Sequence, residues 1–182
     1  LFKGENEADA VFEAAYNLPI NFSNTGSSTD QITATSQITK RIAAISATSS
    51  ENIYALVMLN ATNKVFKVTN DKEQEEFKSS DAKINVNGVM TAMTGKKFKD
   101  VQTIACAIPT EITDGLVMVN APLTNTPSQS GTAPSGNVTT LAVVNKANIR
   151  SSAAESANNP AATIYVERTS AKVTIQYDEG VT

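Results

Sequence analysis

The first clear hydrophobic pattern along the chain lies in residues 5–16. The apolar side chains there recur at spacings of three and four, as on one face of an amphipathic helix. They are Ala8, Val11, Phe12, Ala15 and Tyr16. The pattern predicts a short helix or helical turn that ends at Asn17-Leu18-Pro19. Further along, the spacing of Ile38, Ile42 and Ile45 fits a helix or a broken strand and leaves both open.

Residues 53–59 give the strongest strand signal, because every residue in the run is apolar. Successive side chains of a strand point to opposite faces. One face would carry Ile53, Ala55, Val57 and Leu59, and the other Tyr54, Leu56 and Met58. A strand that is apolar on both faces is covered from both sides, so we expect packing on each side of this segment.

A polar helix is predicted near residues 71–79. Asn70 stands in the N-cap position, and Glu73 stands three residues later in the capping-box position. Phe77 is the expected inward-facing anchor of this helix.

From residue 84 onward the chain consists of short strand-like runs separated by Gly, Pro, Asn or Asp. The runs are residues 84–90, 101–108, 116–119 and 138–144. Residues 121–137 are rich in Pro, Ser and Thr, which is typical of a long exposed loop. The whole pattern predicts a mainly-β fold, a β-sandwich with a few short peripheral helices.

The last strand changes parity along its length. Its apolar residues occupy even positions at Ile164 and Val166 and odd positions at Ala171, Val173, Ile175 and Tyr177. A regular strand keeps its apolar face at one parity, so the pattern predicts a bulge or bend near Arg168-Thr169.

Composition narrows the function mainly through what is missing. The 182 residues suit a single domain, and a net charge of −3 with 18% charged residues favours neither a nucleic-acid surface nor a polybasic membrane patch. The chain has no His, so His-ligated zinc sites and Ser/His/Asp centres are excluded. The single cysteine, Cys106, shares a face with Ile104 and Ile108, and we expect a buried hydrophobe rather than a reactive thiol.

Other candidate chemistry also has simpler explanations. There is no Gly-rich phosphate loop and no nucleophile elbow. The acidic residues at 71–76 and at Asp178-Glu179 lack the oxygen spacing of a calcium loop. Lys96, Lys97 and Lys99 form a small basic patch, which a nucleic-acid reader could use but which in an acidic chain is more simply a solvated edge strand. We therefore expect no enzymatic activity, no cofactor, no metal and no nucleic-acid partner.

Three segments resemble one known family. Val166-Glu167-Arg168, followed after two residues by Ala171-Lys172, is similar to the strand that closes the amino-terminal domain of Bacteroidales fimbrillins, the pilins of the type V pilus. The apolar run that ends in Leu59-Asn60 resembles the family's apolar strand. Gly115-Leu116-Val117-Met118-Val119 resembles its Met-rich strand upstream of the closing motif. Order and spacing agree across residues 50–177.

The resemblance implies a transthyretin-like β-sandwich of about seven strands over residues 1–182, with the family's carboxy-terminal pilin domain absent. It implies a structural subunit that is exported to the outer membrane as a lipoprotein, with membrane contact only through the precursor's lipid anchor. Such subunits form fimbriae by donor-strand exchange with neighbouring pilin subunits, and serve adhesion, biofilm formation and colonisation. Accessory tip or anchor proteins would be further partners.

In the family, proteolysis after an Arg removes a first strand and opens the groove that the next subunit fills. A start at Leu1, with no strand ahead of the first helical segment, fits such trimming. The residues expected to line the groove are Val57, Leu59, Ile164 and Val166.

Two alternatives remain open. The chain could be a tip or anchor subunit of the same system, or an unrelated carbohydrate-binding β-sandwich at the cell surface. A sugar-binding module needs exposed aromatic side chains, whereas the four Tyr and six Phe of this chain lie mostly inside apolar patterns. That favours the structural role, and an enzyme ranks third because His is absent.

Overall fold

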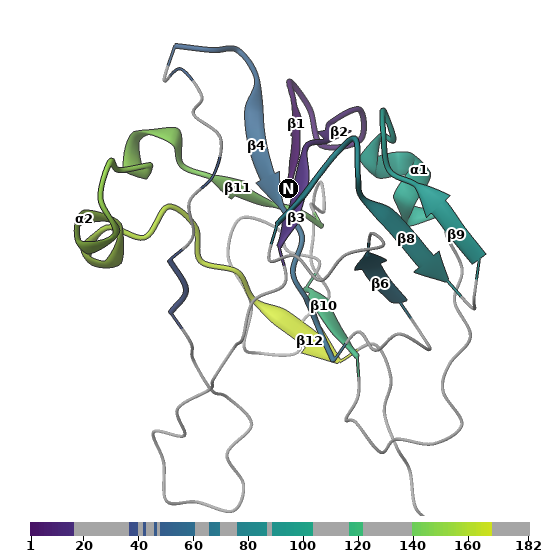
Figure 1. The fold of residues 1–182 in the computed structure, drawn as a ribbon. Coiled ribbons are helices and arrows are strands. Elements are labelled where there is room, and N and C mark those ends of the chain that lie inside the picture. The colour runs from purple at the N-terminus through teal and green to yellow at the C-terminus, as the bar shows by residue number, and fades with distance from the viewer. Residues whose placement is uncertain are drawn as a thin grey trace, which may run out of the picture.

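The computed structural model describes residues 1–16, 37–39, 42, 46, 48–60, 66–69, 76–86, 89–103, 117–121 and 140–168, and every structural statement below concerns these residues. Within them the predicted mainly-β fold with a few short helices is confirmed (Figure 1). The strands are more numerous than the expected set of about seven, and each is only a few residues long.

The strands are β1 (Phe2–Gly4), β2 (Val11–Phe12), β3 (Ala14–Tyr16), β4 (Asn52–Ala55), β5 (Met58–Leu59), β6 (Phe66–Thr69), β7 (Glu76–Lys78), β8 (Lys83–Val86), β9 (Val89–Ala92), β10 (Met118–Asn120), β11 (Ala142–Val144) and β12 (Val166–Arg168). The helices are α1 (Phe98–Gln102), the 3-10 helix η1 (Lys146–Asn148) and α2 (Ala153–Asn158). All strand pairings are antiparallel, and the sheet orders are β11-β4-β1-β2, β12-β10-β5, β6-β8-β9 and β3-β7.

The sheet β11-β4-β1-β2 lies at the centre, with α1 and the β8/β9 hairpin to one side and α2 to the other (Figure 1). A first buried cluster packs against one face of this sheet, and Phe2 meets two aromatic rings edge-on there, Phe12 at 5.7 Å and Phe98 at 5.4 Å between ring centroids. A second cluster contains Ile53, Ala55 and Val144. Apolar burial on both faces is the main stabilising term of such a layered fold.

The predicted helix at residues 5–16 is wrong, because this segment contains a turn followed by β2 and β3. The side chains of Ala10, Phe12 and Ala14 are buried and Val11 and Glu13 are exposed, which is the alternation of a strand. The turn is fixed by Asn6, whose side-chain Oδ1 accepts the backbone N–H of Asp9 at 3.0 Å. Pairing of β2 with β1 outweighed a helical spacing that arose by coincidence.

The expectation that no strand precedes that segment is also wrong, since β1 begins at Phe2 and lies between β4 and β2. The amine of Leu1 is buried and donates to the carbonyl of Ala14 at 2.7 Å. Burial lowers the pKa of this amine from 8.0 to about 5, although the nearby Glu13 carboxylate acts in the opposite direction. The side chain of Leu1 is half-buried and packs against the second cluster.

The two-sided packing predicted for residues 53–59 is confirmed. Ile53 belongs to the second cluster, Tyr54 to the first, and Met58 packs against the first cluster. The segment is nevertheless two strands rather than one, because β4 ends at Ala55 and β5 starts at Met58 in a different sheet. The chain thus passes from one sheet to another at Leu56 and Val57.

The polar helix predicted at 71–79 is wrong where the structure describes it, because residues 76–78 form β7 and pair with β3. Its expected caps, Asn70 and Glu73, lie outside the described residues. The run at 84–90 is likewise divided between β8 and β9, which form an antiparallel pair.

The strand predicted at 101–108 begins instead as part of α1, where Phe98 and Val101 are buried three residues apart on one helical face. The backbone N–H of Lys97 donates to the Asp100 carboxylate at 3.0 Å and caps this short helix. The strands expected at 116–119 and 138–144 correspond to β10 and β11. Cys106, the loop predicted at 121–137 except for Ala121, and the acidic pair Asp178-Glu179 lie outside the described residues.

Candidate functional site

Parts of the three segments that carry the family resemblance form β5, β10 and β12 of one sheet, although more than 100 residues separate the first from the last. β10 and β12 lie side by side in Figure 1. β10 lies in the middle, with Met118 opposite Leu59 of β5 and opposite Arg168 of β12. Val119 of β10 lies opposite Met58 on one side and Glu167 on the other. The candidate site is therefore the sheet β12-β10-β5 and its edges.

Asn120, at the end of β10, is the buried polar residue of this sheet, with 3% of its surface exposed. Its side-chain Nδ2 donates to the carbonyl of Ala55 at 2.8 Å and to that of Thr140 at 3.0 Å. Its Oδ1 accepts the backbone N–H of Val57 at 2.8 Å. These bonds satisfy backbone groups at the point where the chain leaves β4 for β5, so Asn120 joins the two sheets.

Sequence reasoning missed Asn120. In the sequence it ends a short apolar run, as polar residues at strand ends commonly do, and nothing in its neighbours indicates a buried amide. The partners of its side chain are 20 and more residues away, so the signal depends on the tertiary fold.

The four predicted groove residues do not lie along one edge. Leu59, on β5, is buried, and Val166, on β12, lies on the opposite side of β10. Val57 is half-buried between β4 and β5 and bonds to Asn120 through its backbone. Ile164 packs against the second cluster, which contains Val144 of β11. The structure thus brings Val57, Leu59 and Val166 to the sheet around β10, whereas Ile164 packs against the second cluster just before β12.

The bulge or bend predicted near Arg168-Thr169 stays a prediction, because β12 ends at Arg168 and Thr169 lies outside the described residues. The segment ahead of β12 is bound to the chain around β10, because the N–H of Ala121 donates to the carbonyl of Tyr165 at 2.8 Å. β12 itself carries charged residues, Glu167 and Arg168. Charged side chains are typical of an edge that does not accept a further strand.

The basic patch at 96–99 is not a solvated edge strand. Lys97 forms a β-bridge to Val11, Phe98 N–H donates to the Ala10 carbonyl at 2.9 Å, and the Lys96 carbonyl accepts the N–H of Phe12 at 2.8 Å. Lys99 already belongs to α1. This stretch therefore covers the outer edge of β2.

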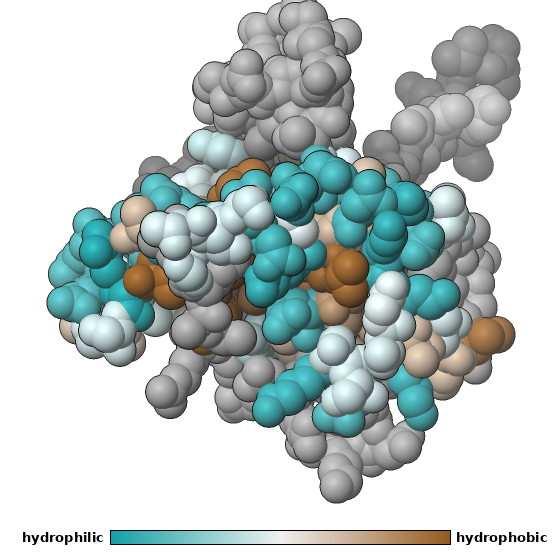
Figure 2. Space-filling view, turned by 90° about the horizontal axis from the view of Figure 1, so that it is seen from above, coloured by the Kyte–Doolittle hydropathy of each residue, from teal (hydrophilic) through white to brown (hydrophobic). Residues whose placement is uncertain are grey.

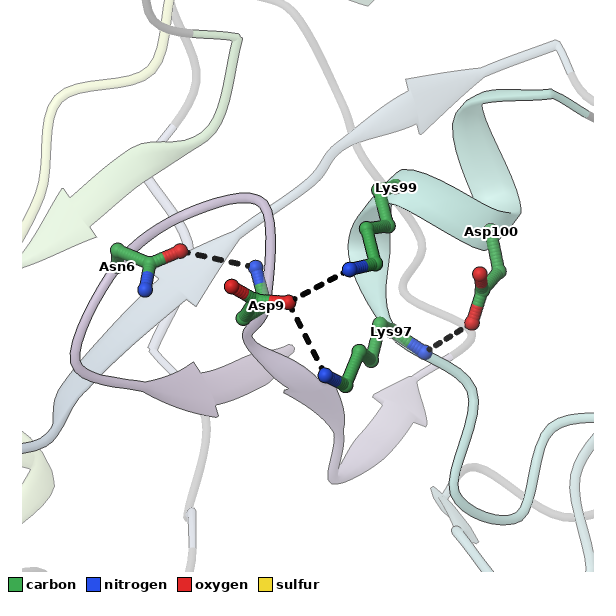
Figure 3. A network of polar contacts seen from close by, with 5 residues as sticks. All are labelled: Asn6, Asp9, Lys97, Lys99 and Asp100. Atoms are coloured by element: carbon green, nitrogen blue, oxygen red, sulfur yellow. Dashed lines mark hydrogen bonds and ion pairs between the residues drawn. The ribbon is translucent and has the colours of Figure 1, made fainter.

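An exposed ionic network holds the patch against the turn at 5–9 (Figure 3). Asp9 Oδ1 accepts Lys97 Nζ at 3.0 Å and Lys99 Nζ at 2.8 Å. The hydrogen bonds from Lys99 and Lys97 lower the pKa of Asp9 from 3.8 to about 2, and the Asp9 carboxylate raises the pKa of Lys99. Two of the three lysines are thus ion-paired within the chain.

A second carboxylate, that of Glu7, ties the same turn to the start of β11. Its Oε1 accepts the backbone N–H of Thr140 at 2.8 Å and that of Leu141 at 3.0 Å. Hydrogen bonds from backbone amides to a carboxylate are among the stronger ones in proteins. Together with Asn120, which binds the Thr140 carbonyl, Glu7 fixes the chain where it enters β11.

β9 contrasts with these covered edges. It lies at the end of the sheet β6-β8-β9, all four of its residues are exposed, and none is charged. Val89 is 66% exposed and Met90 42%. On the face in Figure 2, hydrophobic surface forms small patches among hydrophilic residues.

In the described ranges no group of three or more Cys, Asp or Glu side chains is close enough to hold a metal ion. No helix in the same part of the chain is long and apolar enough to span a membrane.

Comparisons of this chain with protein-family models, with curated proteins and with solved structures found no match. The similarity to fimbrillins therefore stays a resemblance, carried by the three segments that form β5, β10 and β12.

Proposed function

We propose that this chain is a structural subunit of a cell-surface fibre that assembles by strand addition, as the resemblance to pilins implies. The observation that carries the proposal is that parts of the three resembling segments, Met58–Leu59, Met118–Val119 and Val166–Arg168, pair with one another in one antiparallel sheet. Strand addition uses main-chain hydrogen bonds for strength and alternate side-chain pockets for specificity. The end strands of this sheet are β5 and β12, and because β12 carries charged residues, such assembly would use the edge of β5.

The proposed partners are neighbouring copies of the subunit, with accessory tip or anchor proteins at the fibre ends, and the proposed location is the outer surface of the cell. The proposal assigns the chain no catalytic step, cofactor, metal or nucleic-acid partner. Adhesion, biofilm formation and colonisation are the roles that such a fibre would serve.

The aromatic side chains favour this role over sugar binding. Among the aromatic side chains that the structure describes, Phe2, Phe12, Tyr54 and Phe98 are buried in the first cluster, Tyr16 is half-buried and Tyr165 is 47% exposed. Stacking platforms for sugars require several exposed rings close together. A carbohydrate-binding module is therefore the weaker candidate.

Electron microscopy of the natural protein, with its own flanking residues, tests the proposal. The protein is purified, treated with a site-specific protease at arginine, concentrated and imaged beside an untreated sample. The proposal predicts regular fibres that appear after treatment. A treated protein that stays monomeric at every concentration would contradict it.

A further inference from the structure

No strand in the described part of the chain pairs with the outer edge of β9. The N–H of Met93 donates to the carbonyl of Ala82 at 2.9 Å, on the side of β8. Main-chain groups of successive strand residues alternate between the two sides of a strand. The N–H and C=O groups of Met90 and Ala92 therefore point away from β8, toward the open edge.

The same edge leaves part of the core-facing surface uncovered. Ile84 on β8 is buried, with 1% of its surface exposed, and it lies opposite Thr91 of β9. Paired residues of antiparallel strands share a face, so Thr91 and Val89 continue the core-facing side of β8. Both are nevertheless exposed. An added strand would cover Val89.

We propose that β9 pairs with β9 of a second copy of this chain. The two strands run antiparallel about a two-fold axis at Thr91, so that Thr91 lies opposite Thr91 of the copy and Met90 lies opposite Ala92 of the copy. This pairing goes beyond the proposed fibre, because a two-fold contact closes on itself and does not grow.

A second copy fits this edge through its own symmetry. The free groups of Met90 meet those of Ala92 in the copy, and Ala92 meets Met90, so each outward N–H and C=O finds a partner. The register keeps the core-facing side continuous, with Val89 opposite Met93 of the copy. β9 carries no charge, so no like charges are brought together.

The size of the contact sets its strength. Stable interfaces bury about 1,200–2,000 Å² in total, and two strands of four residues bury well below that. The pair is therefore expected to be a weak, transient complex.

Cysteine cross-linking tests the register. In a Cys106→Ser background, which removes the single native thiol, Thr91→Cys places two thiols opposite each other across the axis. Directly opposite Cβ atoms lie about 4.5–5.5 Å apart, close to disulfide geometry, whereas diagonal neighbours lie about 7–8 Å apart. Met90→Cys is the matched control, because in this register Met90 lies opposite Ala92 of the copy and only diagonal to Met90 of the copy.

Mild oxidation of concentrated protein should give a disulfide dimer at least 10-fold faster for Thr91→Cys than for Met90→Cys. Mixing Met90→Cys with Ala92→Cys should restore rapid cross-linking. Equal cross-linking rates for all variants would overturn the register. A cross-linking rate that does not depend on protein concentration would do the same.

Sedimentation equilibrium of the unmodified chain tests the association without a covalent bond. Val89→Lys should weaken it at least 10-fold, whereas Val143→Lys, which adds the same charge on another exposed edge strand, should not. Circular dichroism should show both variants folded, because both side chains are exposed. A chain that is monomeric up to millimolar concentration, or equal effects of the two variants, would overturn the proposal. Fibre formation by the natural protein is scored separately and does not depend on these results.

Discussion

The edges of β2 and β9 differ in what lies beside them. Along β2, residues 96–98 form main-chain hydrogen bonds to Ala10 and Phe12, and Asp9 binds two lysines across the junction. Along β9, Met90 and Ala92 direct their main-chain groups outward and Val89 is 66% exposed. The comparison shows that one chain can close a sheet edge with its own backbone and leave another edge uncovered and uncharged.

The largest effect is expected from removing the anchor that holds the cover on β2. Phe98 is 2% exposed and packs edge-on against Phe2, so Phe98→Ala creates a cavity and frees α1. We expect a loss of about 3–5 kcal/mol in the free energy of unfolding, measured by denaturant titration. Phe98→Leu, which keeps most of the volume, should cost much less. Similar small losses for both would show that α1 is not anchored by this ring.

Asn120→Ala is expected to have the next largest effect. It leaves the N–H of Val57 and the carbonyls of Ala55 and Thr140 without their side-chain partner, at a cost of about 1–3 kcal/mol per buried group. Some of these groups will find water, so we expect a total of about 3 kcal/mol in denaturant titration. The exposed Asn158→Ala is the control and should change stability little. If Asn120→Ala is as stable as the unmodified chain, the side-chain amide does not hold the two sheets together.

Substitution of two glycines, Gly4 near β2 and Gly95 after β9, should distinguish a steric clash from backbone strain. A Cβ on Gly4 would meet the Cα of Ala10 at 2.8 Å, so Gly4→Ala forces the backbone of the covered side apart. Gly95 follows β9 in open space but has a φ of 70°, so Gly95→Ala costs only conformational energy. We expect losses in thermal-unfolding free energy of about 1–3 kcal/mol for Gly4 and about 1 kcal/mol for Gly95. A reversed order would contradict the close approach of β1 to Ala10.

The ionic network over β2 should give the smallest effect, and one that depends on pH. The pKa of Asp9 falls from 3.8 to about 2 in the folded chain, so its stabilising contribution is complete above about pH 4 and is lost as the pH falls through 2. Asp9→Asn should be slightly less stable than the unmodified chain at pH 6. The difference in melting temperature should shrink as the pH falls from 4 to 2, because Asp9 is then protonated progressively, and it should shrink in high salt, because the pair is exposed. A difference of the same size at pH 6 and pH 2 would point to a role other than charge.

The apolar run at 53–59 shows what the sequence could predict. Every residue in it is apolar, so packing on both faces followed directly, and the structure divides Ile53 and Tyr54 between the two clusters. The break between β4 and β5 could not be predicted, because it depends on Asn120, which is far away in sequence. The local pattern of apolar residues predicts which residues are buried. The point at which the chain passes from one sheet to another depends on contacts with residues far away in sequence.

The segment 5–16 shows how a pattern can mislead. Ala8, Val11, Phe12 and Ala15 have helical spacing, yet the buried residues are Ala10, Phe12 and Ala14. Small alanines contribute little to either pattern, so pairing with β1 decided the outcome. The open edge of β9 was equally hidden, because residues 84–90 resembled one uniform strand and exposure depends on where the core ends.

Amide hydrogen exchange, resolved by residue and measured at low and high protein concentration, tests the contrast between the two edges most directly. The amides of Phe12 and Phe98 should be protected at both concentrations, because their partners lie within the chain. The amides of Met90 and Ala92 should exchange rapidly in dilute solution and become protected as the concentration rises. Protection of Met90 and Ala92 in dilute solution equal to that of Phe12, or rapid exchange at every concentration, would contradict an open edge that pairs with a second copy.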